Sequence, residues 1–166
     1  MLLKKNLFIV VFIVFSLNAF ANTPKSTGKY KNWESFVAET EKGKICFAQT
    51  VPTKRAPAAI KRDKSKLFVT FRPAEDIKDE VSITSGHDYK SSTVTASSGK
   101  RKYSFFSQKS FAWLLDDQEE RGFIKLMKKA TNVIIKARTT KGAETTDHYS
   151  MMGFTKAYNT AKKTCG

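Results

Sequence analysis

Apolar and polar residues alternate in short runs along most of this chain, which is the pattern of half-buried β-strands. Two such runs lie on either side of the turn at residues 41–43 and predict a hairpin, and six more follow later in the chain. The runs contain many valine, isoleucine, threonine and phenylalanine residues, which are favoured in strands. The predicted strands are residues 33–38, 45–51, 67–71, 81–84, 92–96, 103–106, 132–139 and 143–151.

Two segments repeat their apolar residues with the spacing of an α-helix instead. The first begins at Asp116 or Asp117, either of which can cap it, and runs to about Ala130. Its acidic residues come early and its lysines late, as the helix dipole favours. The second follows Gly153 and reaches Cys165. The predicted buried faces consist of Phe123, Leu126, Met127 and Ala130 in the first helix, and of Phe154, Ala157, Tyr158, Ala161 and Cys165 in the second.

These elements predict a mainly β protein. We expect a β-sandwich or a partly closed barrel of about seven or eight short strands, with one mid-chain helix and one C-terminal helix. A chain of 166 residues suits a single domain, which we place at residues 33–166. Residues 22–32 are polar, contain Pro24 and Gly28, and are interpreted as a linker.

The first 21 residues have the composition of a secretory signal peptide. Lys4 and Lys5 precede an uncharged apolar run over residues 7–17, and the segment closes with Ala19-Phe20-Ala21. The alternative is an uncleaved membrane anchor, but the run is shorter than the roughly 20 apolar residues that a spanning helix needs. We therefore expect cleavage after Ala21, no later transmembrane segment, and an exported protein that is periplasmic or associated with the outer envelope.

The chain contains only two cysteines, Cys46 and Cys165. In an oxidising compartment, two cysteines in one small domain most simply form a disulfide. A redox or nucleophilic thiol is the alternative, but the chain has no C-x-x-C motif, and no His or Asp lies within several residues of either cysteine. We expect a structural disulfide.

The formal net charge is +15, because 30 Lys and Arg residues stand against 15 Asp and Glu. A field of this sign attracts polyanions, so anionic lipid, lipopolysaccharide and an acidic protein are candidate partners. The alternative is a lysine-rich surface that only keeps the protein soluble. Nucleic acid is a disfavoured partner, because export removes it from reach. The densest basic segment supplies the candidate anion-binding residues: Lys54, Arg55, Lys61, Arg62, Lys64 and Lys66.

Residues with catalytic or metal-binding potential are few. His87 and His148 each adjoin an aspartate, but neighbouring residues on a strand point to opposite faces, so we interpret both as surface or turn histidines. The sequence has no glycine-rich phosphate loop and no G-x-S-x-G nucleophile motif. The acidic residues 116–120 are explained by helix capping. We predict no enzyme activity, no metal site and no cofactor.

The ends of the domain resemble one protein family. The matching features are Trp33, the strand of residues 43–46, the strand of residues 133–135, and the closing run of residues 147–157 that leads to Cys165. Together they are similar to the invasion-associated locus B family of exported alphaproteobacterial proteins. The resemblance is weakest over residues 74–99, and it supplies no catalytic motif.

The resemblance implies a periplasmic or envelope-associated β domain, linked in some pathogens to host-cell invasion. Our first hypothesis is a non-enzymatic envelope protein whose basic face binds an anionic envelope component or an acidic partner. The alternative is a periplasmic adaptor or chaperone-like module that binds proteins through an apolar groove or a sheet edge. Salt should weaken the first kind of binding and spare the second.

Overall fold

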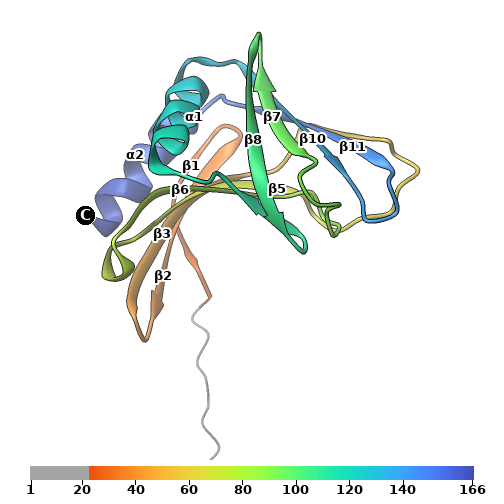
Figure 1. Ribbon diagram of the computed structural model, residues 1–166. Coiled ribbons are helices and arrows are strands. Elements are labelled where there is room, and N and C mark those ends of the chain that lie inside the picture. The colour runs from red at the N-terminus through yellow and green to blue at the C-terminus, as the bar shows by residue number, and fades with distance from the viewer. Residues whose placement is uncertain (1–22) are drawn as a thin grey trace, which may run out of the picture.

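The structure is a computed structural model that describes residues 23–166 (Figure 1). The predicted signal peptide, residues 1–21, lies outside the described residues. The strands are β1 (Lys25–Tyr30), β2 (Trp33–Thr40), β3 (Gly43–Thr50), β4 (Lys54–Ala56), β5 (Lys66–Arg72), β6 (Ile77–Thr84), β7 (Val94–Ser98), β8 (Arg101–Gln108), β9 (Phe111–Trp113), β10 (Asn132–Arg138) and β11 (Glu144–Ser150). The helices are a 3-10 turn at Pro73–Glu75, α1 (Asp117–Lys129) and α2 (Phe154–Cys165).

All eleven strands form one antiparallel sheet in the order β1-β2-β3-β5-β6-β9-β8-β7-β10-β11-β4. Strand β8 joins its two parts, because residues 101–105 pair with β7 while residues 106–108 pair with β9. We call β1, β2, β3, β5, β6, β9 and residues 106–108 of β8 half A, and β7, β10, β11, β4 and residues 101–105 of β8 half B. Figure 1 shows the two halves extending in different directions from β8.

The predicted class is confirmed: the protein is mainly β, with one mid-chain helix, one C-terminal helix and a sheet that does not close. The strand count is higher than expected because three strands were missed. Lys25–Tyr30, interpreted as part of a linker, is instead β1 and pairs with β2 from Lys25↔Val37 to Tyr30↔Trp33. Strands β4 and β9 have only three residues each, too few for alternation to reveal them.

The sheet has an inner face that forms the core and an outer face that meets solvent. Helix α2 packs on β1, β2, β3 and β5, and α1 packs on β6. At the centre, the Trp33 ring lies 4.7 Å from the Phe154 ring, and its indole Nε1 donates to the Ser150 carbonyl at 2.9 Å. The largest fully buried side chains are Trp33, Tyr149, Phe123, Phe154, Leu67, Ile83, Met127, Ile135, Val69, Val81, Val94 and Val133.

The expected disulfide is present between Cys46 on β3 and Cys165 at the end of α2. The two Cα atoms are 5.7 Å apart and the residues are 119 positions apart in sequence. The bond therefore fixes the C-terminal helix to the first half of the sheet. In the chain-entropy description, closing a loop of this length contributes roughly 4–5 kcal/mol.

Local interactions determine where both helices begin. Asp116 caps α1, as expected, because its side chain accepts from the Glu119 backbone N–H at 2.8 Å. Gly153, before α2, has φ of 95°, and a Cβ there would collide with the Tyr30 backbone. Glycine is thus required where the chain passes β1. Within residues 23–166, neither helix has the length and hydrophobicity to cross a membrane.

Candidate functional site

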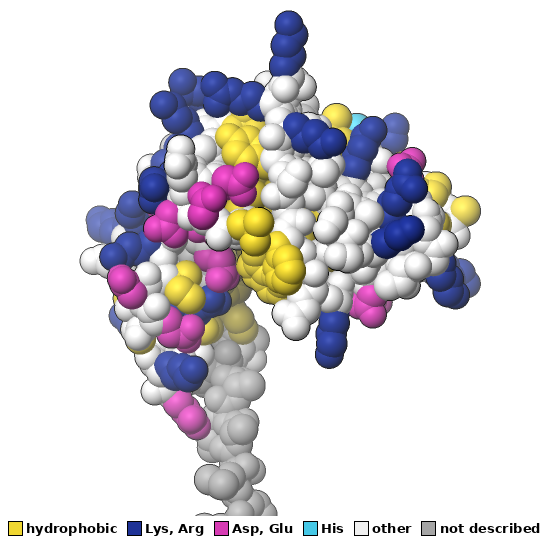
Figure 2. Space-filling view, viewed as in Figure 1, with side chains coloured by type: hydrophobic (Ala, Val, Ile, Leu, Met, Phe, Trp, Pro, Cys, Tyr) yellow, Lys and Arg dark blue, Asp and Glu magenta, His cyan; other side chains and the backbone are white. Residues whose placement is uncertain are grey.

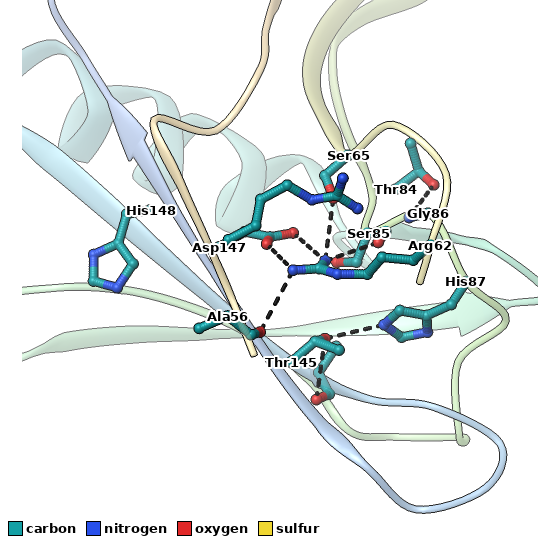
Figure 3. Close-up of polar contacts among 12 residues, drawn as sticks. Ala56, Arg62, Ser65, Thr84, Ser85, Gly86, His87, Thr145, Asp147 and His148 are labelled. Atoms are coloured by element: carbon teal, nitrogen blue, oxygen red, sulfur yellow. Dashed lines mark hydrogen bonds and ion pairs between the residues drawn. The ribbon is translucent and has the colours of Figure 1, made fainter. Parts of the chain in front are cut away.

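A buried ion pair lies beneath the basic segment (Figure 3). The Arg62 guanidinium contacts both Asp147 carboxylate oxygens, at 2.5 and 2.8 Å, and the two side chains are only 2% and 1% exposed. Arg62 also donates to the Ser85 carbonyl at 2.9 Å and to the Ser65 hydroxyl at 3.2 Å. The charge and donors of Arg62 are therefore satisfied inside the protein.

The alternation of β11 explains why a carboxylate enters the interior. Thr145, Asp147 and Tyr149 all point inward, and the carboxylate needs a buried cation. Arg55 lies opposite Asp147 in the β4–β11 pair and donates to the Asp63 carbonyl. These arginine contacts hold the loop between β4 and β5 against half B.

Two tyrosines complete this polar interior. The Tyr89 hydroxyl donates to Ser85 Oγ at 3.0 Å, and burial raises the pKa of Tyr89 to about 12. Burial also raises the pKa of Tyr149 well above its usual value, and its buried hydroxyl has no hydrogen-bond partner among the described residues. Both phenols therefore stay neutral near pH 7, and the cluster contributes to folding rather than to a surface site.

The six candidate anion-binding residues separate into three groups. Lys54, Lys61 and Lys64 are exposed, as an anion site requires. Arg62 is not available to an external anion, and Arg55 is half-buried with its guanidinium directed to the Asp63 backbone. Lys66 lies on half A instead, with Nζ 3.2 Å from the Gln49 side-chain oxygen and 5.7 Å from the centre of the Phe68 ring.

Half B carries a group of cations on its outer face, of which the sequence had indicated only Lys54. Pairing places Lys54 beside His148, then Ile134, Ser97 and Lys102, in one row across five strands. The next row carries Lys136, and the one beyond it Arg138, which forms an ion pair with Glu144 at 2.9 Å. We call the four exposed basic side chains the cationic face: Lys54, Lys102, Lys136 and Arg138.

Inward and outward alternation was the signal that could have identified the cationic face. Its members come from three strands, β4, β8 and β10, so the charge is not concentrated in any one segment of sequence. Apart from Ile134 and His148, several positions between them carry small hydroxyl side chains. These neighbours are Thr95, Ser97, Ser104 and Thr146.

The histidines do not meet. His148 lies on the outer face of β11 while Asp147 points inward, as strand geometry predicts (Figure 3). His87 Nε2 lies 3.0 Å from the Thr145 hydroxyl, and His87 Nδ1 lies 3.0 Å from the Asp88 carbonyl. Across residues 23–166, no group of three or more His, Cys, Asp or Glu side chains is arranged to hold a metal ion.

The outer face of half A is aromatic. Three phenylalanines follow one another across β2, β3 and β5, with ring centres 5.2 Å apart for Phe36–Phe47 and 6.2 Å for Phe47–Phe68. Trp113 continues the row on β9 through its pairing with Ser82, and it stacks on Phe111 at 6.0 Å. We call these rings, with Phe106 opposite Trp113, the aromatic face: Phe36, Phe47, Phe68, Phe106, Phe111 and Trp113.

The aromatic face is open to solvent. Phe106 is 54% exposed and Phe111 is 41% exposed, values that are high for phenylalanine in a folded protein. A shallow hollow of about 340 Å³ runs between these rings and the neighbouring strands. Figure 2 shows hydrophobic side chains gathered on this side of the molecule, with acidic side chains beside them.

Carboxylates border the aromatic face where it meets α1. A cleft of about 580 Å³ is lined by Phe106 and Trp113 together with four carboxylates and one cation, Lys78. The deepest of these acids, Glu120, accepts from the Val81 backbone N–H at 3.0 Å, a role that helix capping did not predict. Burial, and then the charges of its acidic neighbours, raise the pKa of Glu120 to about 7. The carboxylates of the cleft are Asp76, Glu80, Asp117 and Glu120.

No protein family, curated protein or solved structure matched the chain.

Proposed function

We propose that the protein is an exported, non-enzymatic envelope protein of the invasion-associated locus B type that binds an anionic envelope component through its cationic face. The observation that carries the proposal is the exposed group of basic side chains on half B, in which Glu144 is the only acidic neighbour in the paired rows. Lys61 and Lys64 extend the same positive charge into the β4–β5 loop.

The composition of this face favours phosphate groups displayed on a surface. Three of its four cations are lysines, which act as point charges and do not impose the planar geometry of arginine. Serine and threonine hydroxyls between them can donate to phosphate oxygens. Anionic phospholipids and lipopolysaccharide both present such phosphates, and an acidic protein is the third candidate of the original hypothesis.

The polar residues of the interior support a binding role rather than a catalytic one. Arg62, Asp147 and Ser85 hydrogen-bond with one another or with the chain, and their cluster is covered by the β4–β5 loop. The family resemblance supports an envelope location, and it alone adds the link to host-cell invasion.

Sedimentation with vesicles tests this proposal. We would compare vesicles of phosphatidylglycerol and phosphatidylethanolamine with vesicles of phosphatidylcholine, at low and at near-physiological salt. We expect binding only to the anionic vesicles, weaker at higher salt because exposed charges are screened. Lipopolysaccharide added as a competitor then shows which source of phosphate binds more tightly.

Two matched triple variants separate a specific face from overall charge. Lys54→Gln, Lys102→Gln and Lys136→Gln together remove three charges from the cationic face, and we expect at least tenfold weaker vesicle binding. The proposal would be contradicted if the two triple variants lost vesicle binding equally, or if the wild type did not bind vesicles. Binding to a purified acidic protein instead would identify that protein, and not lipid phosphate, as the ligand. The control triple removes three exposed lysines elsewhere, Lys42, Lys125 and Lys163.

A further inference from the structure

The aromatic face needs an explanation of its own, because it lies on half A and shares no residue with the cationic face. Large apolar side chains at one exposed place indicate a contact surface more often than chance exposure. Depletion of charge within the patch and enrichment in Phe and Trp are typical of the buried centre of a protein interface. The two ion-paired residues at its border, Arg72 and Glu80, contact each other at 2.8 Å.

The surrounding charge selects among the occupants that an aromatic sheet face can take. An anionic lipid surface is disfavoured, because four carboxylates and only one cation, Lys78, line the cleft at the border. Asp76 is paired with Lys78 at 2.9 Å and Asp117 with Arg121 at 3.7 Å, but the two carboxylate side chains are 89% and 84% exposed, and such surface pairs are weak enough to exchange for a cation of the ligand. A second copy is disfavoured, because each chain carries a net charge of +15. An uncharged glycan can also stack on the rings and donate hydroxyl hydrogen bonds to the carboxylates, so it is the competing occupant that the test below includes. A ligand that combines apolar and cationic groups satisfies both parts of the surface.

We infer that the aromatic face docks an extended polypeptide segment whose apolar side chains are followed by lysine or arginine. The apolar side chains would lie in the hollow between Phe47, Phe68 and Trp113, and the cations would enter the cleft beside Glu80 and Asp117. This gives the adaptor hypothesis a defined surface and a defined class of partner, and it does not depend on the cationic face.

Polar groups within the hollow suit a peptide backbone. Thr70 and Ser82 lie among the rings on the outer face, and Gln108 lies where the hollow leads into the cleft. Their hydroxyl and amide groups can pair with peptide N–H and C=O groups, which would otherwise lose hydrogen bonds to water on docking. Sequence-tolerant binding is expected, because the hollow is shallow and its rings offer area rather than deep pockets.

The two tryptophans provide a direct readout of docking. Trp33 is fully buried and its indole is hydrogen-bonded, so its emission should not respond to a surface ligand. Trp113 is half-buried on the aromatic face and should respond. The probe is the acetylated peptide Leu-Ser-Phe-Thr-Leu-Lys-Lys with an amidated C-terminus. We expect a saturable blue shift of Trp113 emission, and no shift in the Trp113→Phe variant.

Two control peptides separate the apolar and cationic contributions. Replacing the two lysines of the probe with glutamates, or its apolar residues with serines, should each weaken binding at least tenfold. Equal binding of all three peptides would overturn the inference. So would a larger response to a trimer of N-acetylglucosamine, or a concentration-dependent shift without any peptide, which would indicate a glycan or a second copy as occupant.

Variants on the face itself complete the test, with circular dichroism to check folding. Phe106→Ser with Phe111→Ser should weaken peptide binding at least tenfold, whereas Val51→Ser with Met152→Ser, which removes equally exposed apolar residues elsewhere, should not. Asp76→Asn with Asp117→Asn should weaken binding of the lysine peptide and should not weaken binding of the glutamate-substituted peptide, which has no lysines to lose. If the wild type binds the peptide but not the vesicles, the proposed envelope function is wrong and this inference stands. If it binds the vesicles but not the peptide, this inference is wrong and the proposed function stands.

Discussion

Half A turns Trp33, Cys46 and aliphatic side chains inward and phenylalanine rings outward, whereas half B turns Asp147 and Thr145 inward and lysines outward. Both halves belong to one sheet and obey the same alternation of side chains. They differ in how the inner face is stabilised. Half A has an apolar core fixed to α2 by a disulfide, and half B has, beside its buried apolar residues, an ion pair covered by a loop.

This difference separates the residues that fold the protein from those that can bind a partner. The loss of one buried charge leaves the other without compensation, whereas exposed charges and rings can be exchanged at little cost to stability. The basic segment, residues 54–66, therefore has two roles. Its arginines hold half B together, and Lys54, Lys61 and Lys64 face solvent.

The largest effect on stability is expected at the buried pair of half B. Asp147→Asn leaves the Arg62 guanidinium buried without its counter-charge and should lower the free energy of unfolding by about 3–5 kcal/mol. Urea denaturation measures the change. The double variant Arg62→Met with Asp147→Leu should lose less, because it removes both charges. A loss below about 1 kcal/mol for Asp147→Asn would show that the pair is dispensable.

In half A, the corresponding test is the disulfide. Replacing Cys46 and Cys165 with alanine should lower the free energy of unfolding by about 2–5 kcal/mol, because the unfolded chain is released from a long closed loop. Thermal melting with and without reductant checks this. Reductant should lower the melting temperature of the wild type and leave that of the double variant unchanged. A wild-type melting curve insensitive to reductant would contradict the structural role of the bond.

Glu120 lies at the border between β6 and α1. Unlike the two changes above, its replacement should raise the free energy of unfolding, and the gain should depend on pH. Its pKa is raised from 4.5 to about 7 in the folded protein, so the folded state binds more protons than the unfolded state between these values. Its contribution to stability is present below pH 4.5 and is lost as the pH rises through 7. Glu120→Gln should therefore stabilise the protein at pH 8, by on the order of 2 kcal/mol, and have little effect at pH 4.

The control for this prediction is Glu119→Gln, one position earlier on the same helix. Its side chain is more exposed than that of Glu120, so its substitution should not produce a pH-dependent gain. Chemical denaturation at several pH values measures both variants. Equal behaviour of the two would show that the burial of Glu120 does not control its ionisation.

The smallest effects on stability are expected on the two outer faces. The triple lysine variant of the cationic face and the Phe106→Ser, Phe111→Ser variant should each change the free energy of unfolding by less than about 0.5 kcal/mol per substitution. Thermal denaturation checks this alongside the binding measurements. A larger loss in either variant would mean that its face is needed for folding, and the division between folding residues and binding residues would fail there.

Much of the fold could be predicted from local patterns. Alternation predicted the long strands, the apolar spacing and Asp116 predicted α1, and the two cysteines predicted the disulfide. Strand β1 could not be predicted, because its residues are mostly polar and it is held in the sheet by its pairing with β2. The residue order alone does not distinguish such a segment from a linker.

The candidate site was harder to predict, because burial depends on contacts between distant residues. Arg62 and Asp147 are 85 positions apart, and a buried arginine looks the same in the sequence as an exposed one. Strand β5 has apolar residues on both sides, such as Phe68 and Val69, and this pattern alone does not show whether both of its faces are covered. The sheet leaves its outer face uncovered, and Phe68 therefore becomes part of an exposed aromatic surface.

The central claim is that half B, and not half A, meets an anionic envelope surface. Brominated lipids quench tryptophans that enter a bilayer, and Trp113 lies on the aromatic face while Trp33 is buried. The decisive measurement is tryptophan emission from protein bound to vesicles of brominated phosphatidylglycerol, with Trp113→Phe as the control. The account predicts vesicle binding without quenching of Trp113. Strong quenching of Trp113 would show that the aromatic face enters the membrane and would contradict the account.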